Sequence, residues 1–193
     1  MHPDFFRSGA YVVPPESLAC TMRGFTLPEL MVVLAIAAIV AMFAVPNFQA
    51  TLDRQRISTV TADLHASVVL ARTEAIRRNV RIDLVPMDGI NWTTGWRVVV
   101  PPNPTGPLEV VYSRVPVTGG VTVTRGPAAV EPSLSYDGTG KSRLSTDATV
   151  PVSGEWVIAV PSRPAAPSRK LKINMLGRPS VCDPAQPAQP GSC

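Results

Sequence analysis

The sequence predicts an α+β protein in which one long N-terminal α-helix packs on a mostly antiparallel C-terminal β-sheet domain. Two observations support this fold class. Apolar residues fill a continuous segment at 30–45 and then recur with mainly helical spacing to about residue 80. Beyond that point, short runs rich in β-branched and aromatic residues alternate with turns that contain Pro, Gly or Asn. A helix followed by a series of strands is typical of this class.

The first part of the predicted helix is a candidate for a membrane span. Leu30–Val45 carries no charge but is shorter than the roughly 20 residues that span a bilayer. Extending the helix back to Phe25 reaches that length and includes Glu29. A carboxylate inside the bilayer costs about 2.5–3.5 kcal/mol on insertion scales, so Glu29 should have a partner.

The helix should continue as an amphipathic helix to about residue 80. Its charged residues lie largely off the apolar stripe, and Glu74 and Arg78 form a favourable i,i+4 pair. We interpret the stripe as core packing against the sheet. Its members are Leu52, Ile57, Val60, Leu64, Val68, Ala71 and Ala75.

The remaining residues, 81–193, should form the β-domain and end in a Pro-rich tail. Most of the prolines fall in the loops between the runs. The expected strands are Arg81–Val85, Trp96–Val100, Leu108–Arg114, Val121–Arg125, Leu134–Asp137, Trp156–Val160 and Lys170–Met175.

The junction before the helix has an unusual order of residues. In Arg23–Leu30 a basic residue and a glycine come first, then a phenylalanine, then a glutamate at the head of the apolar helix. This order resembles the leader of type IV prepilins and pseudopilins, which a prepilin peptidase cuts between the residues equivalent to Gly24 and Phe25. An ordinary secretory signal is cut after its apolar region and loses it. The resemblance implies that residues 1–24 are removed, or a shorter leader if translation starts at Met22, and that Phe25 becomes an N-methylated N-terminus.

The same resemblance gives Glu29 a partner. In these proteins the glutamate is neutralised by the N-terminal amine, usually that of a neighbouring subunit, and it serves assembly. The alternative is an ordinary anchor with Glu29 at the level of the lipid headgroups. The family also commonly has a proline at the position of Pro46, which bends or locally opens the helix.

The expected location follows from the basic residues before the span. Arg7 and Arg23 precede it, so the positive-inside rule leaves the N-terminus in the cytoplasm and sends the C-terminal domain to the periplasm. We therefore expect a transmembrane helix at 25–46 in the bacterial inner membrane and its periplasmic continuation at 47–80. From the membrane the protein would move into a pilus or pseudopilus.

Two further segments narrow the resemblance. Leu70–Asn79 and Asn91–Val98 are similar to the end of the long helix and to the following Gly-Trp landmark in the GspH/FimT family of minor pseudopilins. We expect Trp96 to fill the space between helix and sheet, and Gly95 to let the backbone turn into the strand. The family implies two alternatives: a FimT-like minor pilin of a type IV pilus, with possible sequence-independent DNA binding, or a GspH-type pseudopilin of type II secretion without DNA binding.

The C-terminal region bears on the DNA question. Ile173–Cys182 resembles the FimT-type ending, Gly-Arg-x-Arg followed by a cysteine, but Ser180 replaces the second arginine. Residues 161–182 contain five basic residues and no acid, a composition that suits contacts with the phosphates of double-stranded DNA. The alternative is a solvated edge strand or a contact with another subunit. The candidate DNA-binding residues are Arg163, Arg169, Lys170, Lys172 and Arg178.

The cysteines suit an oxidising compartment. After loss of the leader, which contains Cys20, the chain retains Cys182 and Cys193. A disulfide between them would staple the Pro-rich tail, and two unpaired thiols are the alternative. The cysteines and the distant His2 and His65 lack the spacing of a metal site.

The sequence does not predict an enzyme or a cofactor, because it contains no nucleophile–base motif, phosphate loop or metal cluster. A membrane-tethered sensor or binding module would explain the helix and sheet but not the Gly24-Phe25 junction with Glu29. The expected partners are a prepilin peptidase, other major and minor pilins or pseudopilins, and the inner membrane. The FimT-like alternative adds double-stranded DNA.

Overall fold

The computed structural model describes residues 24–102, 106–126, 131–163 and 167–185, without the side chains of 43–47. The chain up to Phe43 and the chain from Ala44 onward form two compact units. One helix, α1 (Leu27–Arg78), belongs to both and is continuous through position 46, so the helix is not opened there. It ends where Asn79 takes a left-handed conformation with φ of 53°, as the residue after a helix often does.

The expected membrane span at 25–46 includes residues 43–46, whose side chains lie outside the described part of the chain. Among the residues that the structure describes, no helix is both long and apolar enough to cross a membrane.

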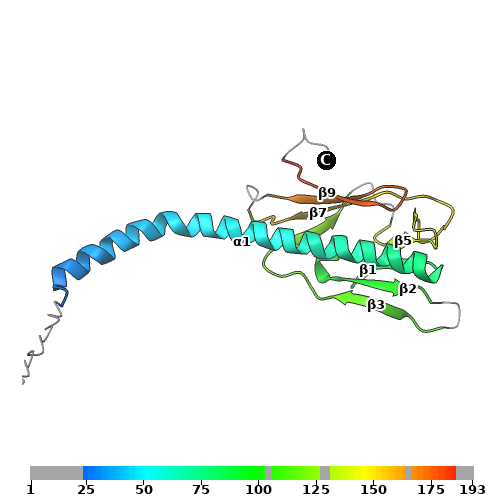
Figure 1. The fold of residues 1–193 in the computed structure, drawn as a ribbon, viewed down its shortest axis with the longest axis horizontal. Helices are drawn as coiled ribbons and strands as arrows, with labels where there is room; N and C mark the ends of the chain where they lie inside the picture. Colours follow the sequence, from blue (N-terminus) through cyan, green and yellow to red (C-terminus); the bar gives the residue numbers. More distant parts are fainter. Residues whose placement is uncertain (1–23, 103–105, 127–130, 164–166, 186–193) are drawn as a thin grey trace, which may run out of the picture. The chain divides into compact units, whose positions relative to one another are not determined.

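The strands form two antiparallel sheets, and the predicted α+β fold class is confirmed (Figure 1). One sheet has the order β3-β2-β1-β5-β6 and the other has the order β4-β7-β8-β9. The elements are β1 (Ile82–Pro86), the 3₁₀ helix η1 (Trp92–Thr94), β2 (Trp96–Val100), β3 (Glu109–Arg114), β4 (Thr122–Arg125), β5 (Leu134–Tyr136), β6 (Ser142–Arg143), β7 (Gly154–Ala159), β8 (Arg169–Ile173) and β9 (Pro179–Cys182).

All seven strands expected from the sequence are present, and the structure adds β6 and β9. These two are short, and their residues lack the β-branched and aromatic enrichment that marks the others. β9 begins at Pro179, which a strand tolerates at its first position and at the edge of a sheet. Both strands form because tertiary pairing supplies a neighbour, not because of local propensity.

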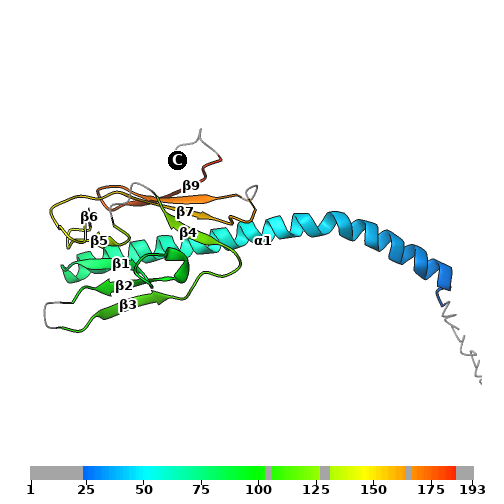
Figure 2. The ribbon, with the colours of Figure 1, turned by 180° about the vertical axis from the view of Figure 1, so that it is seen from behind.

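The part of α1 that belongs to the second unit covers both sheets with its apolar stripe (Figures 1 and 2). All the expected stripe residues are buried except Leu52, which is 37% exposed and near the beginning of the packed part of the helix. Arg78 and Glu74 form the expected ion pair, with 2.7 Å between Nε and Oε2.

Three tryptophans fill the centre of the core. Trp92 and Trp156 meet edge to face with ring centroids 5.1 Å apart, and Trp96 lies 6.4 Å from Trp92. Trp96 is fully buried, and its indole Nε1 donates a hydrogen bond to Ser67 Oγ on α1 at 2.8 Å. The prediction that Trp96 fills the space between helix and sheet is confirmed.

Gly95 also has the predicted role. It has a φ of 97° and caps η1, so it redirects the chain into β2. A side chain at this position would place a Cβ 2.2 Å from the backbone oxygen of Arg114 on the neighbouring strand. Only glycine fits this turn without displacing β3.

Candidate functional site

The N-terminal site residues lie at the start of α1. Gly24 and Phe25 precede the helix, and Phe25 is 80% exposed. Glu29 is in the first turn, where its Oε2 accepts a hydrogen bond from the backbone N–H of Thr26 at 3.4 Å. This bond is one half of a capping box, in which a glutamate three residues after the cap satisfies a free backbone donor. The pattern Thr26-x-x-Glu29 that marks this cap can be recognised in the sequence itself.

Gly24 has no structural requirement for glycine. No described atom lies within 4 Å of the position that a Cβ would occupy there. A need for glycine at this position would therefore come from an enzyme that reads the junction and not from the fold.

The segment after Glu29 is apolar on every side. Its large side chains are half or more exposed in the isolated chain, with values between 54% for Leu30 and 79% for Met42. A helix that is apolar all round is normally buried, whereas an amphipathic helix needs only one covered face. This segment therefore requires a lipid or protein environment that covers its entire circumference.

The basic residues predicted to contact DNA are largely neutralised. Arg163 forms an ion pair with Asp53 of α1, although the two are far apart in sequence. Lys170 and Lys172 both face Glu155 of β7, with Nζ–Oε distances of 2.9 and 3.9 Å. Residues 161–182 contain no acid of their own, and the carboxylates that pair with these basic residues come from other elements of the fold.

The candidates also do not all share one face. Lys170 and Lys172 alternate along β8 with Leu171, which is buried in the core, so the two lysines point away from α1. Arg169 lies on the same side of the strand as Leu171 and forms an ion pair with Asp183. No single basic surface therefore includes all five residues.

Arg178 differs from the other four. It lies in the turn between β8 and β9, is exposed and makes no ion pair with any described residue. Asn174 builds this turn, because its Oδ1 accepts hydrogen bonds from the backbone N–H groups of Leu176 and Arg178 at 3.0 and 2.9 Å. Arg178 is therefore the one candidate of the five that has no carboxylate partner among the described residues.

The glycine before Arg178 has a structural role. Gly177 has a φ of 75°, and a Cβ here would approach the backbone oxygen of Gly140 to 2.3 Å. The hydroxyl of Tyr136 donates to the carbonyl of Gly177 at 3.1 Å, and burial raises the pKa of this tyrosine. Arg72 of α1 donates to the carbonyls of Gly140 and Leu176 at 2.9 and 3.4 Å, which fixes both turns to the helix.

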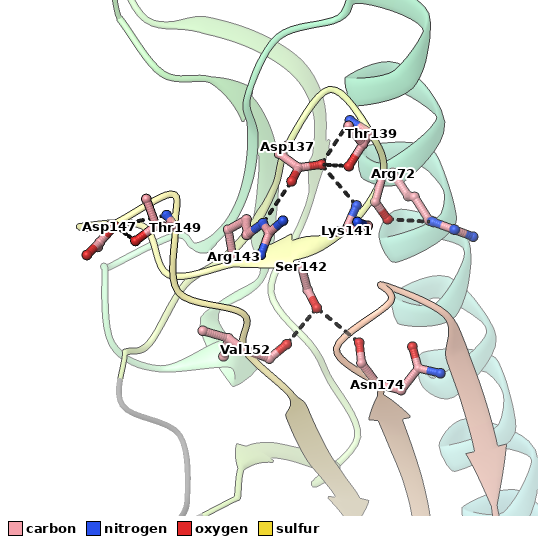
Figure 3. Close-up of polar contacts among 11 residues, drawn as sticks. Arg72, Asp137, Thr139, Lys141, Ser142, Arg143, Asp147, Thr149, Val152 and Asn174 are labelled. Carbon is pink, nitrogen blue, oxygen red and sulfur yellow. Dashed lines mark hydrogen bonds and ion pairs between the residues drawn. The ribbon is translucent and has the colours of Figure 1, made fainter.

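Figure 3 shows how the turn that contains Gly140 is held. Asp137 Oδ1 accepts hydrogen bonds from the backbone of Thr139 and Lys141, and its Oδ2 accepts one from Arg143 at 2.8 Å. Burial raises the pKa of Asp137, but these hydrogen bonds outweigh burial and lower it from 3.8 to about 2. Ser142 Oγ lies 3.0 Å from the carbonyl oxygen of Asn174, which joins β6 to the end of β8.

Cys182 is buried at the end of β9 and is disulfide-bonded. Cys193 lies outside the described residues, so the Cys182–Cys193 pairing stays a prediction.

The comparisons with known proteins decide the family. Residues 60–177 match the family model of the type II transport protein GspH, and residues 21–45 match the model of the prokaryotic N-terminal methylation motif. The chain belongs to the GspH family. It is a minor pilin or pseudopilin of a type IV pilus or a type II secretion system. No curated protein matches the sequence significantly.

Two solved structures share the fold of this GspH-family chain. The type IV minor pilin FimU of Pseudomonas aeruginosa superposes with a TM-score of 0.54 at 18% identity, over 66% of this chain and 89% of FimU. The minor pseudopilin EpsH from the type 2 secretion system of Vibrio cholerae gives a TM-score of 0.50 at 10% identity, over 67% of this chain and 98% of EpsH. At these identities the likeness establishes the fold alone.

Membership of the GspH family also accounts for the absence of catalytic motifs in the sequence. The matched family model describes a component of a transport apparatus and not an enzyme, in agreement with the prediction. Three residues that hold the β-domain together were not predicted from the sequence, namely Asp53, Arg72 and Tyr136. Their importance lies in partners more than 40 residues away, and no local pattern indicates such partners.

Proposed function

We propose that this chain is a minor pilin that enters a type IV pilus through its N-terminal helix, after cleavage between Gly24 and Phe25 and N-methylation of Phe25. The observation that carries the proposal is the fully apolar, exposed segment that follows Glu29. Lipid would cover this segment before assembly, and the helices of neighbouring pilins would cover it in the filament. The membrane is the inner membrane, with the β-domain in the periplasm.

Glu29 would select the neighbouring subunit. A carboxylate among apolar helices is costly unless a positive charge neutralises it, and the free amine at Phe25 of an adjacent pilin is such a charge. In the isolated chain Glu29 caps its own helix. Capping and recognition of an amine therefore have to be separated by experiment.

The decisive comparison is between Glu29→Gln and Glu29→Ala. Glutamine keeps the side-chain oxygen that can cap the helix but removes the charge, whereas alanine removes both. We expect both variants to insert into the membrane, and both to be lost from sheared pili, measured by quantitative mass spectrometry. Incorporation of the glutamine variant at the wild-type level would contradict the charge-neutralising role and would leave only the cap.

The type IV pilus is favoured over type II secretion by the C-terminal turn. The Gly177-Arg178 pair and Cys182 resemble the FimT-type ending, and Gly177 is required by the packing of that turn. The alternative is a pseudopilin of type II secretion that assembles by the same helix. Deletion of the gene separates the two, because it would reduce piliation in one case and protein secretion in the other.

Sequence-independent binding of double-stranded DNA is a second candidate function. Of the five candidate residues, the one that supports this function is Arg178, which is exposed and has no acidic partner among the described residues. A contact of this kind positions a phosphate without reading bases and weakens as salt rises. Each of the four other candidates has a carboxylate within ion-pair distance that would compete with a phosphate.

A further inference from the structure

A groove lies between α1 and β9, the edge strand of the second sheet. Its volume is about 500 Å³, within the range of sites that bind ligands. One wall is a stripe of small or polar residues on α1, of which Ala62 and His65 are members. The other wall is β9, where Val181 pairs with Leu171 and so lies on the helix-facing side of the sheet.

β9 has one unpaired edge. It is the last strand in its sheet, and no strand in the described part of the chain pairs with its other side. Such an edge presents backbone N–H and C=O groups that can pair with another extended chain. Pro179 has no N–H, so the donors available for added pairing come from the rest of the strand. Val181 is 43% exposed although it faces the helix, so an apolar surface accompanies the edge.

The lining of the groove contains donors for an anion. Arg169 lines it together with His65, and no carboxylate is among the lining residues. Asp183 binds one Nη of Arg169 from outside the groove. A guanidinium has five N–H donors, so this pair leaves donors for a second acceptor. The groove therefore combines a pairing edge, an apolar contact and donors for an anionic side chain.

We propose that this groove binds an extended, acidic segment of another protein, which adds as a strand to β9 and places a carboxylate against Arg169 and His65. Strand addition supplies affinity through the backbone, and side-chain pockets supply specificity. The groove lies wholly within the unit that begins at Ala44 and does not include Glu29. The test of peptide binding can therefore fail while the proposed filament role stands, and the filament role can fail while the groove still binds the peptide.

The test uses the full chain in detergent and the labelled peptide TTVEVTT, with fluorescence anisotropy as the measurement. We expect saturable binding. The peptide TTVQVTT, which lacks the carboxylate, should bind at least about tenfold more weakly, because a charge-assisted hydrogen bond is lost. The peptide TTPEPTT, which cannot form a strand, should not bind.

Two tryptophan variants on α1 locate the site. Ala62→Trp fills the groove and should abolish binding. Ala66→Trp is the matched control, because Ala66 is also an exposed alanine of α1 but lines the separate small pocket next to Tyr112, and this variant should leave binding unchanged. Far-UV circular dichroism checks that both variants are folded, because each variant adds a tryptophan to the three of the native chain.

Several results would overturn the proposal: no saturable binding at millimolar peptide, equal affinity for the acidic and glutamine peptides, or unchanged binding by Ala62→Trp. Self-association of the chain that is lost in Ala62→Trp would identify a second copy, and not a different protein, as the occupant.

Discussion

The substitution Arg163→Met should destabilise the β-domain more than is usual for a half-exposed arginine. Arg163 is the main partner of Asp53, a carboxylate on α1 that is only 1% exposed. Arg56 is a second cation, at 3.5 Å from Asp53, and its Nη1 also donates to the carbonyl of Gly119. Together these contacts tie the loops after β3 and β7 to the same turn of the helix.

The magnitude follows from which group is left without a partner. A buried ion pair that loses one member costs about 3–5 kcal/mol, because the other charge stays buried without compensation. Arg56 remains near Asp53, so we expect a loss of about 3 kcal/mol in the free energy of unfolding, at the lower end of that range. Removing the carboxylate as well should relieve the penalty, and the double variant Asp53→Ala/Arg163→Met should be more stable than Arg163→Met alone.

The assay is urea unfolding of the full chain in detergent, followed by tryptophan fluorescence, because Trp92, Trp96 and Trp156 all report on the β-domain core. Arg77→Met is the matched control. It also removes one of two arginines from an α1 carboxylate, but that carboxylate, Glu74, is more exposed. We expect little change for the control. A double variant no more stable than Arg163→Met would refute the reasoning, as would a loss as small as that of Arg77→Met.

Three further predictions concern processing, the tail and DNA. Gly24→Ala should leave the fold unchanged but block removal of the leader by a prepilin peptidase; N-terminal mass spectrometry showing normal cleavage would contradict this. Cys182 and Cys193 should contain no free thiol by alkylation, and Cys193→Ser should cost at most about 3 kcal/mol, because the loop that the bridge closes is short. In a gel-shift assay at low salt, Arg178→Gln should weaken the binding of double-stranded DNA of unrelated sequences more than Lys172→Gln does. The reason is that the ammonium group of Lys172 lies near the carboxylate of Glu155. Equal effects of these two substitutions would argue against Arg178 as the contact.

Much of the fold could be predicted because its signals are local. The helix stripe, the seven enriched strands and the Gly95-Trp96 turn each depend on residues within a short window, where periodicity and backbone preference act directly. The leader is local as well, because the order of residues around Gly24 and Glu29 is enough to indicate a prepilin or pseudopilin, and the segments 70–79 and 91–98 indicate the GspH/FimT family. The cap that Thr26 and Glu29 form belongs to the same local class.

The sequence by itself therefore determined the class of protein, the long helix and the position of the N-terminal motif. Only the tertiary structure decided which basic residues of the C-terminal region have carboxylate partners, because Asp53 and Glu155 reach Arg163 and Lys170 from distant elements. It also decided β9, which exists because β8 offers it an edge, and the groove that β9 forms with α1. Side-chain charges interact through space, and strands pair across any length of chain, so neither property can be read from a local window.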